Sequence, residues 1–313
     1  MKVKVFIDGS SGTTGLRISD RLAERPEIEL LSISAEGRKD VHERAKVINS
    51  ADLAFLCLPD AASKEVMPLL RPDVKVLDTS TAFRTDAAWD YGFPELKGQK
   101  AKIQNSYRVA VPGCYASGFI SIARPLVELG LVAKDYPFSC TGISGYSGGG
   151  KKMIADYESP DRPAHSKLDA PKSYGLSLAH KHLPEMQKIS GLAHTPMFVP
   201  VVCDYYCGMQ VLVPLDLGLA GTTAEAVAAA LADYYKDAAT VKVHALNEPL
   251  PENGLYSNAM AGTDRMELYL TVNAAGDQMM LVSLFDNLGK GSSGAAVQCM
   301  NLMLGLEETK GLE

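Results

Sequence analysis

The sequence lacks an apolar run of the roughly 18 residues that a transmembrane helix requires, so we expect no membrane span and no membrane partner. The N-terminal segment MKVKVFIDGS also lacks the long apolar stretch and the small-residue cleavage site of a secretory signal. Lys and Arg number 31 against 37 Asp and Glu, and the resulting net charge of −6 argues against a nucleic-acid partner.

Cysteine is also sparse. The six cysteines, at positions 57, 114, 140, 203, 207 and 299, are too scattered for a disulfide scaffold, and this usage favours the reducing cytoplasm. Cys203 and Cys207 form the closest pair, but no second Cys or His pair at zinc-like spacing accompanies them. We therefore expect no metal site and interpret both as small buried residues on a strand.

The first half of the chain alternates between strand-like and helix-like segments. Strands are predicted at 2–8, 28–34, 52–58 and 74–78, with helices around 14–24, 40–48 and 62–70. Because such alternation builds βαβ units with right-handed crossovers, it predicts an α/β fold with a doubly wound, Rossmann-type parallel sheet.

The pattern changes after about residue 130. Longer strands are predicted at 136–144, 196–203, 207–214, 266–272 and 277–285, with one clear helix at 222–236 and a terminal helix at 291–306. Few helices separate these strands, so we expect a second, α+β domain with a largely antiparallel sheet. A length of 313 residues accommodates two such domains.

A glycine-rich loop, DGSSGTTG, follows the first predicted strand and opens the first predicted helix. Glycines there permit a tight turn and let backbone N–H groups approach a pyrophosphate at the helix N-terminus. The spacing is GxxGxxG and so differs from the dinucleotide-binding fingerprint GxGxxG. The prediction of a nicotinamide dinucleotide therefore depends on the position of the loop, directly after a strand and before a helix. The alternative is a purely structural turn. We expect cofactor contacts from Gly9, Ser11, Gly12, Thr13, Thr14 and Gly15.

The end of the second strand bears on which dinucleotide binds. An acidic residue there holds the ribose 2′-hydroxyl of NAD, whereas this chain has Ser34 followed by Arg38 and Lys39. A hydroxyl and two cations suit a 2′-phosphate, which favours NADP(H). Glu36 in the same segment leaves NAD open, and an ordinary solvated loop is the alternative for both cations.

Cys114 is the candidate nucleophile. It lies in VPGCYASGFISIARPL, where Pro112 and Gly113 form a turn and apolar residues then recur at helical spacing. At a helix N-terminus a thiolate is stabilised. It can attack an activated acyl group and form a thioester that accepts a hydride. The alternative is a buried structural cysteine.

The segment SYGLSLAHKHLPEMQ, residues 173–187, supplies candidates for proton transfer. His180 and His182 precede a short helix whose first turn accommodates Pro184, and Glu185 can pair with an imidazole. Side chains at this spacing point in opposite directions on an extended chain, so we expect only one imidazole to face the reacting carbon. Which one does so stays open, and a polar surface loop is the alternative.

Together these segments resemble one family, the shorter form of N-acetyl-gamma-glutamyl-phosphate reductase, over essentially the whole chain. The matching motifs are DGSSGTTG, DTSTAFR (78–84), YGFPEL (91–96), PGCY (112–115), SGYSGGGK (144–151), HKHLPE (180–185) and DNLGKGSSGAAVQ (286–298). Val111 is a departure, because the family usually has Asn there.

The resemblance implies NADPH-dependent reduction of an acyl phosphate, N-acetyl-gamma-glutamyl phosphate, to the semialdehyde and phosphate in arginine biosynthesis. It places the nucleophile on Cys114 and the acid/base on His180 or His182, with Tyr174 and Glu185 nearby. It also suggests substrate contacts from Arg84, Ser144, Ser147 and Gly148, and a cofactor contact from Asn287.

The resemblance further implies a cofactor domain from residues 1–113 and 287–313, closed by the C-terminal helix, and a catalytic and dimerisation domain from 114–286. We expect a homodimer or homotetramer. Aspartate-semialdehyde dehydrogenase is the rival enzyme, and a non-catalytic NADP-binding sensor is the rival from another class.

Overall fold

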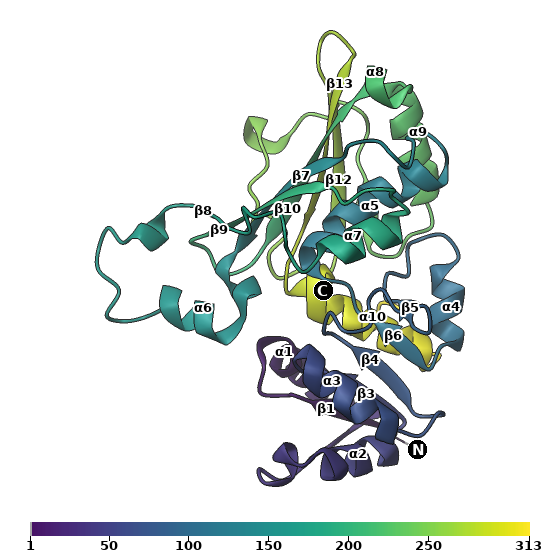
Figure 1. Ribbon diagram of the computed structural model, residues 1–313, viewed down its shortest axis with the longest axis vertical. Helices are drawn as coiled ribbons and strands as arrows, with labels where there is room; N and C mark the ends of the chain where they lie inside the picture. Colours follow the sequence, from purple (N-terminus) through teal and green to yellow (C-terminus); the bar gives the residue numbers. More distant parts are fainter. Residues whose placement is uncertain (1) are drawn as a thin grey trace. The chain divides into compact units, whose positions relative to one another are not determined.

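The computed structural model describes residues 2–313, and the chain divides into two compact units (Figure 1). Unit 1 comprises the chain up to Gly113 together with Ser292–Leu312, and unit 2 comprises Cys114–Gly291 with Glu313. The sequence prediction assigns residues 287–291 to the cofactor domain, whereas here they lie in unit 2. One reason is that the Asn287 amide oxygen accepts a hydrogen bond from the Gly208 N–H at 2.8 Å.

Unit 1 contains a six-stranded sheet in which every neighbouring pair is parallel, which confirms the predicted Rossmann-type sheet. The strand order is β2-β1-β3-β4-β6-β5. The strands are β1 (Val3–Asp8), β2 (Ile28–Leu31), β3 (Leu53–Leu56), β4 (Lys75–Asp78), β5 (Asp90–Tyr91) and β6 (Arg108–Ala110). The helices are α1 (Thr13–Ala23), α2 (Val41–Ser50), α3 (Asp60–Val66), α4 (Gln99–Asn105) and α10 (Gly294–Met303).

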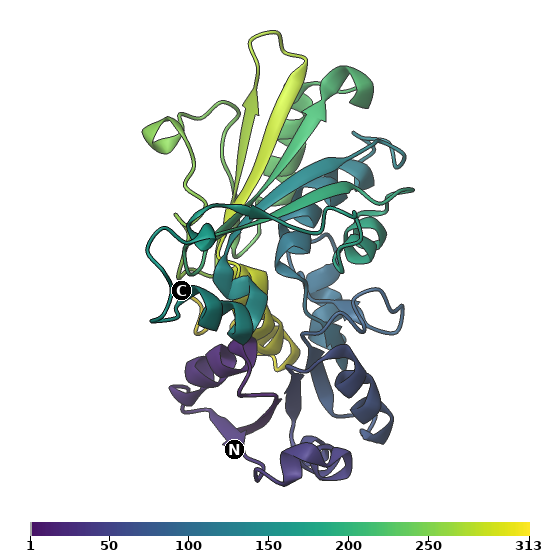
Figure 2. The same cartoon turned by 60° about the vertical axis from the view of Figure 1, so that its left-hand side comes forward.

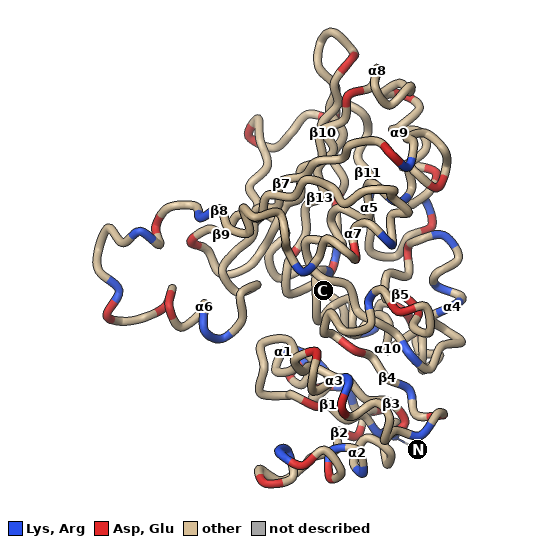
Figure 3. Tube along the Cα trace, viewed as in Figure 1, with Lys and Arg blue, Asp and Glu red and all other residues tan. Residues whose placement is uncertain are grey.

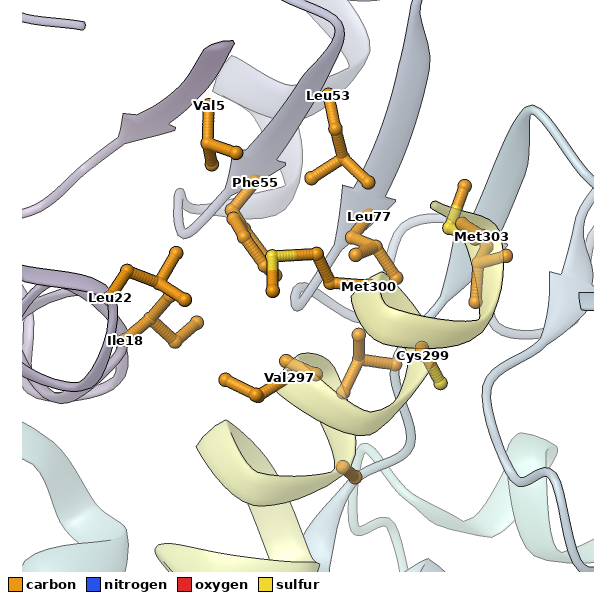
Figure 4. Packing of buried hydrophobic residues seen from close by; sticks show 14 of the residues in the cluster. Val5, Ile18, Leu22, Leu53, Phe55, Leu77, Val297, Cys299, Met300 and Met303 are labelled. Carbon is orange, nitrogen blue, oxygen red and sulfur yellow. The ribbon is translucent and has the colours of Figure 1, made fainter. Parts of the chain in front are cut away.

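Two apolar clusters cover the two faces of this sheet. Along β1, Val5 and Ile7 belong to one cluster and Phe6 to the other, as the two-residue repeat of a strand requires. The first cluster includes Ile18 and Leu22 of α1 and most of α10, and Figure 4 shows Met300 pointing toward Phe55 in this layer. The C-terminal helix is therefore part of the core of unit 1.

Unit 2 contains a seven-stranded mixed sheet in the order β11-β12-β13-β10-β7-β9-β8. The strands are β7 (Ser139–Gly145), β8 (Lys172–Ser173), β9 (Met197–Cys203), β10 (Met209–Asp216), β11 (Val241–Val243), β12 (Met266–Val272) and β13 (Gln278–Phe285). The β7–β9 and β11–β12 pairs are parallel and the others are antiparallel, which confirms a largely antiparallel sheet.

The longest helix of unit 2, α5 (Cys114–Glu128), lies against β10 and β13 (Figures 1 and 2). Nearly all of its side chains are buried, as expected for a helix that is apolar on most of its circumference. The Ser121 and Ser283 hydroxyls bond at 2.9 Å and join α5 to β13. The other helices are α6 (Gly150–Tyr157), α7 (Leu183–Ser190), α8 (Leu217–Ala220) and α9 (Ala224–Tyr234).

Some local predictions were wrong. The expected terminal helix, 291–306, begins earlier, as a π-helical turn at Gly289–Ser293, and α10 ends at Met303. Cys203 ends β9, but Cys207 lies in the bend after it, and both are only half-buried.

Lys and Arg are interspersed with Asp and Glu along the trace of each unit (Figure 3). Over residues 2–313, no helix has the length and apolarity to cross a membrane.

Candidate active site

A cavity of about 420 Å³ in unit 1 adjoins the glycine-rich loop. It lies where β1 and β2 end, the position at which doubly wound sheets hold dinucleotides. Its lining consists of Phe6, Ile7, Asp8, Gly9, Ser10, Ser11, Ser19, Leu30, Leu31, Ser32, Ile33, Arg38 and Leu58.

The glycine-rich loop has the geometry of a cofactor cradle. Gly9 has φ +86°, and a Cβ there would lie 2.3 Å from the Cys57 carbonyl oxygen. A Cβ at Gly15 would lie 2.5 Å from the Gly9 carbonyl oxygen. The Gly12 N–H donates to that same oxygen at 2.9 Å, which closes the turn before α1. Neighbouring backbone thus excludes side chains at Gly9 and Gly15 and keeps the turn tight, and the loop fits the predicted dinucleotide.

The remaining predicted cofactor residues of unit 1 differ in their contacts. Ser11 and Arg38 line the cavity, whereas the Ser34 hydroxyl accepts from the Gly37 N–H at 3.0 Å and stabilises the turn that carries Arg38. Thr14 Oγ1 lies 3.1 Å from Ser292 Oγ and ties α1 to the segment before α10. Thr13 begins α1, and Lys39 is exposed and is not among the lining residues.

Asp8, which the sequence analysis did not single out, ends β1 beside this loop. Its carboxylate accepts from Arg44 Nε at 2.8 Å, and both side chains are buried. Burial raises the pKa of Asp8, while the Arg44 bond opposes that shift. The pair fixes the strand end from which the glycine-rich loop starts.

Cys114 is the first residue of α5 in unit 2, as predicted, and it is half-buried. The N–H groups of the first turn of a helix have no intrahelical partners, and the helix dipole there favours a negative charge. Burial raises the pKa values of Cys57, Cys140 and Cys203, that of Cys57 to about 12. Among the cysteines, Cys114 alone begins a helix.

The two histidines do not point in opposite directions, so that prediction was wrong. Their rings lie 4.7 Å apart, nearly perpendicular, because residues 180–183 form a turn in which the Leu183 N–H donates to the His180 carbonyl at 3.0 Å. His182 is buried and His180 is half-buried. Both rings therefore belong to one cluster.

The protonation of His180 follows from its contacts. The His182 backbone N–H donates to His180 Nδ1 at 3.2 Å, which leaves the ring proton on Nε2. Burial and, to a smaller extent, the charge of Lys181 lower its pKa to about 4. His180 is therefore neutral near pH 7 and offers an Nε2–H donor.

Two tyrosines lie close to the histidines and also interact electrostatically with Cys114. The Tyr115 ring lies 5.9 Å from that of His180 and 6.1 Å from that of His182, and the Tyr174 ring lies 5.9 Å from that of His180. Burial raises the pKa of Tyr174 to about 12 and that of Tyr115 well above its usual value, and the charge of Cys114 raises both further. Tyr174 was predicted near the site, whereas Tyr115 was missed although it follows the cysteine directly.

Ser144 and Ser147 of the predicted Gly/Ser loop are buried, whereas Gly148 is exposed, and Asn287 anchors the loop. The Asn287 amide donates to Ser147 Oγ at 2.9 Å, and its oxygen accepts from the Gly208 N–H. A Cβ on Gly148 would lie 3.4 Å from that amide nitrogen and 3.5 Å from Ser144 Oγ. Substrate contacts from Ser144, Ser147 and Gly148 and a cofactor contact from Asn287 stay predictions.

Two other sequence candidates, Glu185 and Arg84, are buried in their own units, as is Val111, the departure from the family. Glu185 is buried in the first turn of α7, where the helix dipole favours a carboxylate. Arg84 of unit 1 is buried and donates to the carbonyls of Val111 and Thr79, each at 2.9 Å. These bonds support the backbone, and a substrate contact from Arg84 stays a prediction. Val111 packs in the core of unit 1, which suits an apolar side chain.

The comparisons with known proteins agree with this architecture. Residues 4–104 match the model of the semialdehyde dehydrogenase NAD-binding domain, and residues 114–287 match that of the semialdehyde dehydrogenase dimerisation domain. Solved aspartate semialdehyde dehydrogenases share the fold. One from Francisella tularensis has 14% identity and a TM-score of 0.72 over 96% of this chain and 100% of that chain. One from Vibrio cholerae has 18% identity and a TM-score of 0.70 over 97% and 99%.

The matches thus define the class as oxidoreductases of the semialdehyde dehydrogenase type, and they confirm the nicotinamide-cofactor domain. A reductase from Trichormus variabilis is 46% identical over 99% of both chains, and one from Burkholderia lata is 47% identical over 96% of both. Both carry the name N-acetyl-gamma-glutamyl-phosphate reductase. The chain belongs to the N-acetyl-gamma-glutamyl-phosphate reductase family.

Proposed function

We propose that this protein reduces N-acetyl-gamma-glutamyl phosphate to N-acetylglutamate semialdehyde and phosphate, with NADPH as the reductant, in arginine biosynthesis. The observation that carries the proposal is the cluster formed by Cys114, Tyr115, Tyr174 and His180 in a chain 46% identical to named reductases. A cysteine at a helix start with a neutral imidazole nearby suits acyl transfer through a thioester.

In the proposed reaction, the Cys114 thiolate attacks the acyl carbon of the substrate. The carbon–oxygen bond to phosphate breaks, phosphate leaves, and a thioester on Cys114 remains. When bound, NADPH supplies the hydride that this thioester needs. The resulting thiohemiacetal on Cys114 collapses to the aldehyde and regenerates the thiolate.

We assign the hydrogen-bond donor of this reaction to His180. Its Nδ1 accepts the His182 N–H, so Nε2–H is the atom that can donate to the carbonyl oxygen where negative charge develops. His182 is buried, and the hydrogen bond from its backbone N–H positions the His180 ring. Tyr174 and the buried Glu185 complete the polar surroundings of the histidine segment.

The cofactor half of the proposal rests on unit 1. The exclusion of side chains at Gly9 and Gly15 and the adjoining cavity support a bound dinucleotide. Arg38 in the cavity lining supports NADPH over NADH, because a guanidinium can bind a 2′-phosphate through two parallel hydrogen bonds.

A comparison of two substrates tests the proposal. The purified protein is assayed in the oxidative direction with NADP and phosphate, once with N-acetylglutamate semialdehyde and once with aspartate semialdehyde. We expect kcat/KM to be at least about 100-fold higher for the acetylated substrate, because a site built for its polar groups rejects an analogue without them. Cys114→Ser is the control and should lower kcat roughly 1,000-fold.

Two outcomes would contradict the proposal. Equal or faster turnover of aspartate semialdehyde would favour the rival enzyme. NADP binding without turnover of either semialdehyde would favour a sensor.

We also propose a homodimer or homotetramer in the cytoplasm. The match of unit 2 to a dimerisation domain supports association, and residues such as Met197, Val199 and Val201 leave apolar surface on β9 exposed or half-buried. Six cysteines with free thiols suit a reducing compartment.

A further inference from the structure

The π-helical turn Gly289–Ser293 lies directly against the candidate nucleophile. A Cβ built on Gly291 would lie 2.9 Å from Cys114 Cβ, 3.2 Å from a ring carbon of Phe285 and 3.1 Å from the Asp286 carbonyl oxygen. Gly291 is not among the positive-φ glycines, so its backbone conformation is one that any residue adopts. Glycine is required at this position because there is no room for a Cβ, and the backbone conformation imposes no such requirement.

Several bonds restrain the turn within unit 2. The Gly291 N–H donates to the Asp286 carbonyl at 2.9 Å, and the Asp286 carboxylate accepts from Gly262 at 2.7 Å and Leu288 at 2.8 Å. A Cβ on Gly289 would lie 2.0 Å from the Thr263 carbonyl oxygen, so the start of the turn is equally confined.

Helix α5 is confined from the other side. A Cβ on Gly118, one turn after Cys114, would lie 2.5 Å from a methyl group of Val211. Ser121 bonds to Ser283, and the Tyr235 hydroxyl donates to the Ser121 carbonyl at 2.7 Å. A Cβ cannot move without its backbone, so a methyl group at residue 291 must shift the first turn of α5 against these contacts, and that shift moves the Cys114 thiol.

We propose that Gly291 is a positioning residue that sets the orientation of the Cys114 thiol. This rests on the proposed function, in which that thiol forms the thioester. The π turn brings a backbone without a side chain against Cβ of Cys114, and this contact restricts the directions that Sγ can take. Local widening of a helix beside a reactive group is a known use of π turns.

The first test separates this role from a general loss of stability. Gly291→Ala should lower kcat by about 100-fold, because an error of about 1 Å in a reacting group has that effect. It should also change the alkylation rate of Cys114, followed by peptide mass spectrometry, several-fold. The Kd for NADPH should stay within twofold, because the cofactor cradle lies in unit 1. Gly254→Ala, with no atom within 4 Å of the added Cβ, is the matched control and should behave as the parent.

Gly289→Ala disturbs the same turn through the Thr263 carbonyl and serves as the second control. If Gly291→Ala keeps kcat within twofold of the parent, the proposal is wrong. It is also wrong if both alanine variants lose Cys114 reactivity in the same proportion to their loss of Tm. Alkylation requires no substrate, so this readout holds even if the proposed substrate is incorrect.

A double-mutant cycle keeps the test decisive if Gly291→Ala folds poorly. Cys114→Gly removes the Cβ that the new methyl group would meet, so Gly291→Ala should lower Tm less in that background than in the parent. Equal losses of Tm in the two backgrounds would show that the two residues do not contact each other, and would overturn the proposal.

Discussion

Among single residues, His180 has the most narrowly defined chemical state. Its Nδ1 accepts a backbone hydrogen bond, so a replacement preserves function only if it offers a donor where Nε2 lies. His180→Gln should retain more activity than His180→Ala, which should lower kcat by about 100-fold or more. Steady-state kinetics of the two variants measure this difference. Equal losses would argue against donation from Nε2.

The same residue predicts a pH dependence. Burial lowers the pKa of His180 to about 4, whereas the unfolded chain takes up the proton near pH 6.5. Because the unfolded state then binds more protons, the free energy of unfolding falls as the pH drops from about 6.5 to 4. Urea unfolding across that range should show a shallower decline for His180→Gln. Parallel curves for the variant and the parent would contradict the shift.

Gly9 gives a test of the cofactor cradle. Gly9→Ala combines a left-handed backbone with a Cβ 2.3 Å from the Cys57 carbonyl oxygen, and we expect a loss of about 3 kcal/mol or more and weaker NADPH binding. Gly98 has φ +73° but open space around the added Cβ, so Gly98→Ala should cost only about 1 kcal/mol and leave NADPH binding unchanged. Similar losses in both variants would mean that the close approach at Gly9 has no energetic role.

At the scale of elements, local signals predicted most helices and strands. The strand 266–272 has the predicted bounds, and α9 begins after Thr223, whose hydroxyl accepts from the Ala226 N–H at 3.2 Å. Apolar periodicity also predicted α5. These features depend on interactions between residues close in the sequence, so the sequence alone predicts them.

Contacts between distant segments were harder to predict. The side-by-side histidines depend on a turn that an i,i+2 argument for extended chain does not anticipate. The approach of Gly291 to Cys114 joins residues far apart in the chain, and no local pattern encodes it. Tyr115 was missed although it follows Cys114, because its role depends on rings contributed by residues 174–182.

Helix α10 illustrates how one element stabilises unit 1. Met300 is fully buried in the cluster that contains Phe55 and Leu77 (Figure 4). Met300→Ala should lower the free energy of unfolding by about 2–4 kcal/mol, measured by urea denaturation, because it removes apolar contacts and leaves a cavity. Leu69→Ala, at a residue that is 37% exposed in the same unit, should cost less than about 1 kcal/mol. A comparable loss in both would show that α10 contributes little.

At the scale of the whole molecule, the two chemical tasks are assigned to different parts of the chain. The proposed cradle for the cofactor belongs to unit 1, and the proposed nucleophile with its histidine and tyrosine neighbours belongs to unit 2. Damage to either task can therefore be measured separately, by cofactor affinity in one case and by thiol reactivity in the other.

The position of α10 in the core of unit 1 has a consequence for synthesis. The strands of unit 1 leave the ribosome first, but the apolar layer around Phe55 is only partly covered, by residues such as Ile18 and Leu22, until the residues up to Met303 have been made. Apart from Glu313, unit 2 is continuous in sequence and ends at Gly291. The later-synthesised part can therefore finish folding first, and the nascent N-terminal sheet is the segment that most needs protection from aggregation meanwhile.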